Sequence, residues 1–146
     1  MISNSPDTFV VLCVHSPMHK AYLEVIEHIG ENNTKFLGYD IVADVEPERI
    51  ANQIFDEILG TIEEKQSVLI LTDLIGATPY NISKSVLEKL QKKGVQSDLI
   101  SGINMGILLT ALRSHSLPFN ELKQKIILSG RKCMKLDSEV NDIAES

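Results

Sequence analysis

Short runs of consecutive apolar residues alternate along the chain with longer segments in which apolar residues recur every three or four positions. The clearest run is Val68–Leu71, which ends in the polar residues Thr72 and Asp73. Four consecutive aliphatic side chains are typical of a strand that is buried on both faces, as in a parallel sheet covered by helices. Weaker runs predict three further strands, at 9–14, 36–42 and 97–101.

The segments between these runs predict helices. Within 47–62 an isoleucine recurs at every fourth position and acidic residues hold the other side, as in an amphipathic helix. Comparable patterns predict helices over 17–29, 79–93, the residues after Asn104, and 118–130; the first carries Tyr22, Val25, Ile26 and Ile29 on one face. Ser16 and Thr78 each precede a proline, so we expect both hydroxyls to cap a helix whose first residue is that proline.

This alternation predicts an α/β fold, a single doubly wound domain with a four-stranded parallel sheet in the order 2-1-3-4. We expect the domain to occupy residues 1–136 and a polar, acidic tail to occupy residues 137–146. The segment Lys132–Leu136 has apolar residues between lysines and is too short to form a stable hairpin alone. We therefore expect it to add a strand to the sheet edge of a second copy, which would make the protein a homodimer.

Composition narrows the possible functions. The 146 residues suffice for one domain with a real core, and the net charge of −6 argues against nucleic-acid binding. We expect no direct membrane insertion, because no apolar run approaches the ~18 residues of a membrane span, and residues 1–8 do not resemble a signal peptide. Cys13 and Cys133 lack metal-ligand spacing, so we expect no metal site and free thiols in the cytoplasm. We also expect no cofactor.

Polar residues follow three of the predicted strands and indicate a site. His15 ends the first strand, Asp73 follows the third, and the Gly102–Asn104 turn follows the fourth. In a 2-1-3-4 sheet the first and third strands are neighbours at the switch point, so His15 and Asp73 are expected to face each other there. The two helix N-termini at the same edge would bind an anion. Imidazole, carboxylate and helix N-termini together suggest phosphoryl transfer through histidine.

Other interpretations fit some of these residues. His15 alone is more often a loop residue, and Asp73 alone would serve to stabilise the next helix N-terminus. In a receiver-like signalling domain Asp73 itself would accept phosphate, but the acidic residues that such a domain needs after its first strand are replaced by His15, Ser16 and Pro17. A non-catalytic interaction module on the same fold is the other alternative.

Three motifs carry a family resemblance. The first is Val14-His15-Ser16; the second is Thr72-Asp73 followed by Gly76–Asn81; the third is Gly102–Ile107. Over roughly Phe9–Leu136 the chain resembles the mannose-type enzyme IIA component (the mannose, fructose and sorbose family) of the phosphoenolpyruvate-dependent sugar phosphotransferase system. It departs from the family pattern by Ser16 and Ala77 in place of glycines and by Gly106 and Ile107 in place of Pro-Met.

The resemblance implies a phosphotransferase component. It implies that His15 is the phosphorylated residue and Asp73 its hydrogen-bonded partner, with the phosphoryl group held by Ser16, Gly76, Ala77, Thr78 and Asn104. The implied donor is the histidine-containing phosphocarrier protein and the implied acceptor is an enzyme IIB, with a regulatory role as the alternative to transport. The resemblance also implies a homodimer that shares C-terminal strands.

Overall fold

The computed structural model describes residues 6–30 and 36–140, which contain four strands, five α-helices and one short 3₁₀ helix. The strands are β1 (Phe9–His15), β2 (Leu37–Ile41), β3 (Val68–Thr72) and β4 (Ser97–Ile100). The helices are α1 (Met18–Ile29), α2 (Pro47–Thr61), α3 (Thr78–Lys92), α4 (Met105–Arg113) and α5 (Phe119–Lys132), and the 3₁₀ helix is η1 (Asp137–Glu139).

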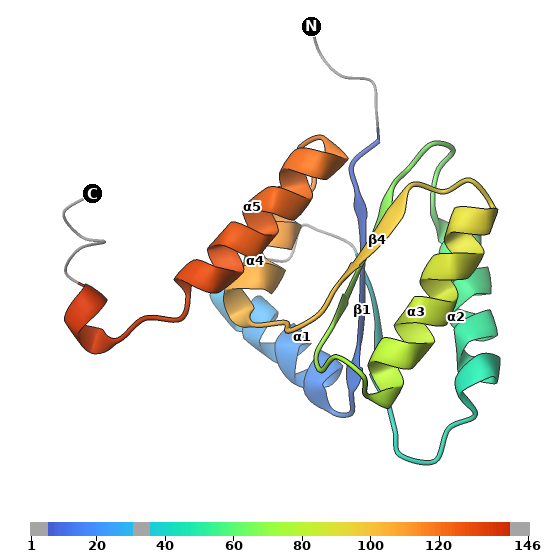
Figure 1. Cartoon of the computed structure of the whole chain (residues 1–146), viewed down its shortest axis with the longest axis horizontal. Helices are drawn as coiled ribbons and strands as arrows, with labels where there is room; N and C mark the ends of the chain where they lie inside the picture. The colour runs from blue at the N-terminus through green and yellow to red at the C-terminus, as the bar shows by residue number, and fades with distance from the viewer. Residues whose placement is uncertain (1–5, 31–35, 141–146) are drawn as a thin grey trace, which may run out of the picture.

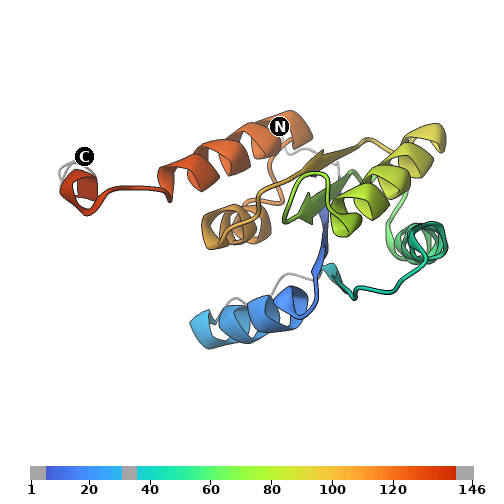
Figure 2. The ribbon, with the colours of Figure 1, turned by 60° about the horizontal axis from the view of Figure 1, so that its bottom comes forward.

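All strand pairs are parallel, and the order across the sheet is β2-β1-β3-β4, which confirms the predicted fold. The helices α1, α4 and α5 lie on one face and α2 and α3 on the other (Figures 1 and 2). Alternate residues of β1 serve the two layers: Leu12 packs with α4 and α5, whereas Val11 packs with α2 and α3. The central strands are therefore buried on both faces, as their unbroken apolar runs predicted.

The start of α1 differs from the prediction. The helix begins at Met18 with Pro17 as its N-cap residue, and no side chain at that position provides a cap, so the expected Ser16 cap is wrong. The acceptor comes from β2 instead: the Asp40 carboxylate accepts the backbone N–H groups of His19 at 2.8 Å and Lys20 at 3.2 Å. A strand neighbour thus satisfies two of the donors that a helix N-terminus leaves unpaired.

The caps of the other helices are partly as predicted. Thr78 is itself the first residue of α3 and Ala77 is the N-cap, so the predicted Thr78 cap is also wrong. Asn104 caps α4 as expected, because its Oδ1 accepts the Ile107 N–H at 2.9 Å. Gly30 ends α1 in the left-handed conformation that glycine adopts at low cost.

The expected positions of two side chains on α1 are also wrong. Val25 and Ile29 were expected to face the core from α1, but both are exposed and only Ile26 of that helix is fully buried. His115 lies in the turn after α4. There its Nδ1 lies 3.0 Å from Asp7 Oδ2.

The C-terminal segment leaves the body of the domain. The last helix continues past Gly130 to Lys132, and residues 133–136 form no strand within the described chain. They run outward to η1, with Met134 and Leu136 exposed (Figures 1 and 2). The part of the predicted acidic tail at 141–146 lies outside the described residues. Within 6–30 and 36–140 no helix is long and apolar enough to cross a bilayer.

Candidate active site

His15 and Asp73 meet at the carboxyl edge of the sheet, between β1 and β3. Asp73 Oδ2 accepts the backbone N–H of His15 at 2.9 Å and lies 2.7 Å from the ring Nδ1. The His15 side chain is 47% exposed, and the Asp73 side chain beneath it is 11% exposed. Because an ionised carboxylate can only accept, Nδ1 carries a ring hydrogen, and in the neutral ring Nε2 then has the lone pair. The predicted meeting of these residues is confirmed.

The environment of Asp73 favours its ionised form. Partial burial acts to raise the pKa of Asp73, but hydrogen bonds from the backbone and ring of His15 and from the Leu74 N–H outweigh it. The pKa of this carboxyl group therefore lies below its ordinary value. The result is an anion held in place by three donors next to an exposed imidazole.

The loop after β4 is hydrogen-bonded to the backbone at Asp73. Gly102 N–H donates to the Asp73 backbone oxygen at 2.8 Å, and Ile103 N–H donates to the Thr72 oxygen at 3.1 Å. The third motif thus contacts the second directly. The Asn104 side chain is used within the fold, because Oδ1 caps α4 and Nδ2 donates to Gly130 O on α5 at 3.1 Å.

Of the two helix N-termini predicted to lie beside His15, that of α3 remains open for an anion. Gly76 has a φ of +84°, which suits glycine, and it turns the chain so that exposed Thr78 begins the helix. The first helical N–H groups have no acceptor within the helix, and no side chain caps them. At α1, by contrast, Asp40 already holds the N–H groups of His19 and Lys20. The expectation of two open helix ends is therefore wrong for α1.

The remaining predicted site residue is Ser16, which lies exposed at the end of β1. Its backbone N–H donates to Ile41 O at 3.0 Å, so β2 fixes the backbone that immediately follows His15. Sequence reasoning missed Asp40, which lies one residue before Ile41 in β2. A signal existed, since an aspartate near the end of a parallel strand lies at the same edge as the neighbouring helix N-terminus.

Two buried polar groups lie under α3. Thr72 is fully buried, and its Oγ1 has no hydrogen-bond partner among the described residues. Cys13, paired with Thr72 across β1 and β3, points its Sγ at Pro79 O from 3.6 Å. Burial raises the pKa of the Cys13 thiol to about 11, so this cysteine is a neutral core residue. In the described part of the chain no three His, Cys, Asp or Glu side chains are grouped to hold a metal ion.

Comparison with known proteins agrees with this arrangement. Residues 9–127 match the family described as the PTS system fructose IIA component. The sorbose-specific EIIA component of the PTS from Lacticaseibacillus casei is 29% identical over 116 residues, which cover 77% of this chain and 78% of that protein. The fructose-specific EIIA component from Bacillus subtilis (strain 168) is 34% identical over 86 residues, which cover 58% of this chain and 52% of that protein.

Solved structures share the fold. The EIIA component from Streptococcus agalactiae superposes with a TM-score of 0.77 at 21% identity, over 90% of this chain and 98% of that one. The mannose/sorbose-specific IIA subunit from Enterococcus faecalis superposes with a TM-score of 0.75 at 17% identity, over 90% of this chain and 95% of that one.

The fold and site together define a doubly wound α/β protein with a histidine–carboxylate pair at its switch point. The family match extends over most of the chain. The protein belongs to the fructose- and mannose-type enzyme IIA components of the sugar phosphotransferase system. The resemblance read from the three sequence motifs is thereby confirmed.

Proposed function

We propose that this chain is a cytoplasmic phosphohistidine carrier. It accepts a phosphoryl group on Nε2 of His15 from the histidine-containing phosphocarrier protein and passes it to an enzyme IIB, or uses the phosphorylated state as a regulatory signal. The observation that carries the proposal is the 2.7 Å contact between His15 Nδ1 and Asp73 Oδ2. This contact holds the ring in the tautomer whose other nitrogen is the nucleophile.

In the transfer step the lone pair of Nε2 attacks the phosphorus of the donor. The bond from Nε2 to phosphorus forms as the bond from phosphorus to the donor's ring nitrogen breaks, and the donor ring leaves with that electron pair. The Nδ1 hydrogen stays on His15, whose ring becomes positively charged. Asp73 is already ionised and bonded to that hydrogen, so it stabilises the charge as it develops.

The phosphoryl oxygens need donors close to His15. We assign this part to the start of α3, where Gly76 and Ala77 shape the turn and Thr78 offers both its N–H and its hydroxyl. We also assign Ser16 to the phosphoryl-binding residues, because it is exposed and directly follows His15. Asn104 acts differently in this proposal. With both polar ends of its side chain bound elsewhere, it holds the loop that contacts Asp73.

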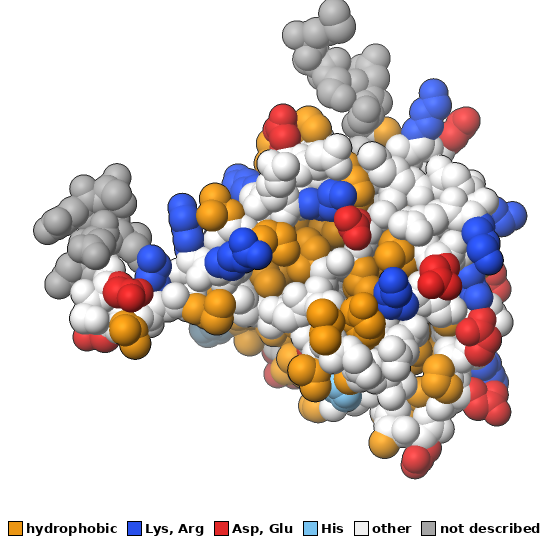
Figure 3. Space-filling view, viewed as in Figure 1, with side chains coloured by type: hydrophobic (Ala, Val, Ile, Leu, Met, Phe, Trp, Pro, Cys, Tyr) orange, Lys and Arg blue, Asp and Glu red, His pale blue; other side chains and the backbone are white. Residues whose placement is uncertain are grey.

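We also propose a homodimer in which the C-terminal segment of one copy pairs with β4 of the other. In the described chain β4 is an edge strand that pairs with β3 alone. Beside it lies a groove of about 770 Å³ between β4 and α5. Figure 3 shows apolar side chains in this hollow with basic side chains at its border. An open strand edge beside an apolar groove is a site for an added strand.

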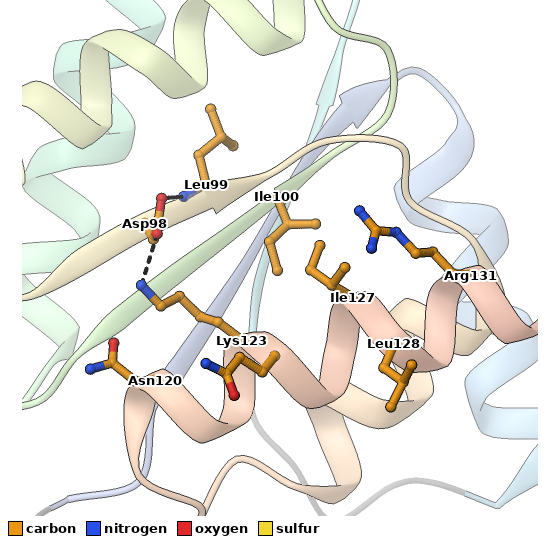
Figure 4. Close-up of a pocket in the computed structure, with 9 residues that line it drawn as sticks. Asp98, Leu99, Ile100, Asn120, Lys123, Ile127, Leu128 and Arg131 are labelled. Carbon is orange, nitrogen blue, oxygen red and sulfur yellow. Dashed lines mark hydrogen bonds and ion pairs between the residues drawn. The ribbon is translucent and has the colours of Figure 1, made fainter.

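The side chains around the groove suit the proposed strand. Ile100 of β4 and Ile127 of α5 face it, while Lys123 crosses to Asp98 at 2.9 Å (Figure 4). The outgoing segment supplies two exposed apolar side chains, Met134 and Leu136, which have no place in their own domain. Pairing would bury them and satisfy outward-facing backbone groups of β4 other than the Leu99 N–H, which already donates to Asp98 Oδ1 at 2.8 Å.

The experiment that tests the carrier function is transfer from phosphoenolpyruvate through enzyme I and the phosphocarrier, followed by mass spectrometry of the intact chain and its peptides. One phosphoryl group is expected on His15, stable to alkali and labile to acid. His15→Ala should take up none, whereas His28→Ala, a matched change at an exposed position on α1, should behave as the wild type. Alkali-labile phosphate on Asp73 would instead identify a receiver-like domain.

A further inference from the structure

The helices α4 and α5 lie side by side (Figures 1 and 2), and they approach closely at two glycines. A Cβ on Gly130 of α5 would lie 2.5 Å from Cγ1 and 2.9 Å from Cδ1 of Ile107, in the first turn of α4. A Cβ on Gly106 of α4 would overlap the Sγ of Cys133, which follows α5. Neither glycine has a positive φ, so each is needed for space rather than for backbone conformation.

The side chain that faces Gly130 has little room to move aside. Ile107 is 5% exposed and belongs to the core cluster between the sheet, α4 and α5. A close-packed neighbour of this kind transmits a displacement instead of absorbing it. Gly106 and Ile107 are also the two positions at which the third motif departs from the Pro-Met of the family pattern, so this contact between the helices is a feature of this chain.

The close approach brings the backbone of α5 to the side chain of Asn104. Its Nδ2 donates to Gly130 O at 3.1 Å, while its Oδ1 accepts the Ile107 N–H at 2.9 Å. One amide group thus joins the end of α5 to the beginning of α4. The side chain is short, so both bonds form only at the helix spacing that Gly130 permits.

Asn104 ends the loop that contacts Asp73. Two residues earlier, the Gly102 N–H donates to the Asp73 backbone oxygen at 2.8 Å. The Asp73 carboxylate in turn accepts the backbone and ring N–H groups of His15. A displacement of Asn104 therefore moves the loop, and the loop moves the strand end that carries the carboxylate.

We infer that Gly130 is a positioning residue for Asp73, which it reaches through Asn104 and the loop after β4. The inference rests on the proposed function. Gly130 touches neither His15 nor Asp73, but the spacing of α4 and α5 that it permits sets where Asp73 holds the imidazole ring. In-line transfer to Nε2 depends on that orientation, and small displacements of a reacting group lower the rate steeply.

Gly130→Ala tests the inference. Its methyl group pushes α5 away from Ile107, so single-turnover labelling of His15 should slow by ~10- to 100-fold. The factor should be the same with the phosphocarrier and with phosphoramidate, because the ring and not a docking surface is affected. With phosphoramidate the P–N bond breaks, ammonia leaves, and the bond from Nε2 to phosphorus forms. Adding Ile107→Ala removes the opposing atoms and should restore most of the rate.

A double-mutant cycle shows whether Gly130 acts through Asp73. In an Asp73→Asn chain the ring has already lost its orientation, so adding Gly130→Ala should slow labelling little further. A purely structural defect would reduce the rate by the same factor in both chains. A full-sized loss in the Asp73→Asn chain would therefore overturn the inference.

The matched control is Gly60→Ala on α2, where nothing lies within 4 Å of the added Cβ. It should label at the wild-type rate with both donors. Circular dichroism checks that Gly130→Ala is folded. If it is not, Asn104→Asp replaces it, because aspartate keeps the oxygen that caps α4 and loses the donor to Gly130 O.

Asn104→Asp should also slow labelling, and its loss should likewise shrink in the Asp73→Asn chain. A wild-type rate in the folded Gly130→Ala chain, or in Asn104→Asp where that chain replaces it, would overturn the inference. Failure of the wild-type chain to take label on His15 from either donor would instead refute the proposed function.

Discussion

One oxygen atom of Asp73 accepts both N–H groups of His15, the backbone N–H at 2.9 Å and the ring Nδ1–H at 2.7 Å. The carboxylate is thereby tied to the strand that carries the imidazole as well as to the imidazole itself. The ring is therefore already oriented, and the proposed transfer would need no rearrangement of Asp73.

Asp73→Asn should slow phosphoryl transfer to His15 by about 100-fold, the low end of what positioned acid–base groups contribute. Asparagine has one oxygen, so it cannot accept the two His15 N–H groups and the Leu74 N–H as the carboxylate does. Single-turnover labelling with excess donor measures the rate, and circular dichroism checks the fold. Transfer at the wild-type rate would show that the carboxylate does not assist the ring.

The same carboxylate predicts a pH dependence of stability. Its pKa is lower in the folded chain than the ordinary value of about 4, so its contribution is fully present above that pH and is lost as the pH falls through the folded-state pKa. The free energies of unfolding of the wild type and Asp73→Asn should therefore differ at pH 5.5 and converge as the pH falls below about 4. Urea titrations across this range give both values. A difference that stays constant would contradict the assignment.

Thr72→Val should stabilise the protein. The Thr72 hydroxyl is fully buried without a hydrogen-bond partner among the described residues, and valine has the same shape without the polar atom. The free energy of unfolding should rise by about 1 kcal/mol, which corresponds to a rise in Tm of about 2–4 °C for a chain of this size. Thr72→Ser is the control, since it keeps the hydroxyl, loses the methyl group and should be less stable than the wild type. A less stable valine variant would indicate a bound water at this hydroxyl.

Asp40→Ala should lower the free energy of unfolding by about 1 kcal/mol, the usual cost of losing an N-terminal cap. The side chain accepts the N–H groups of His19 and Lys20, although it lies on β2 rather than in the helix. Asp40→Asn retains one acceptor oxygen, so its free energy of unfolding should fall by less than that of Asp40→Ala. Denaturant titration of both variants tests this, and an alanine variant as stable as the wild type would mean that water replaces the cap at no cost.

Removal of the residues after Cys133 should convert the proposed dimer to a monomer. This cut leaves α5 intact together with the contact of Cys133 Sγ, which lies where a Cβ on Gly106 would be. The truncated chain loses Met134 and Leu136, the side chains assigned to the β4 groove of the other copy. Multi-angle light scattering of both chains gives their masses. Equal masses for the two would refute strand exchange.

The sheet was predictable because its signals are local. Unbroken aliphatic runs such as Val68–Leu71 occur in strands buried on both faces, and a parallel order then brings every carboxyl end to one edge. That is enough to place His15 beside Asp73 without any knowledge of distances. The cap at Asn104 was equally local, since the acceptor and the Ile107 N–H are three residues apart.

The errors arose where a tertiary contact replaced a local one. Asp40 caps α1 from a neighbouring strand, so a Ser16 cap is not needed. The signal for Asp40 was its place near the end of a strand, and no local spacing links it to the helix that it caps. Val25 and Ile29 follow helical periodicity, yet α1 covers an edge of the sheet and only part of its apolar stripe reaches the core. Periodicity reports which residues share a face and cannot report how much of that face is covered.

The hydrogen bonds from the Gly102 and Ile103 N–H groups to the end of β3 affect how fast these two amides exchange with solvent. Amide protons in loops normally exchange with solvent quickly, whereas those held by backbone hydrogen bonds exchange only when the structure opens. These two loop amides are attached to the backbone of Asp73 and Thr72, so their exchange rates report the opening of the carboxylate's own strand end. Amide hydrogen exchange at these two residues therefore monitors the site in the absence of any phosphoryl donor.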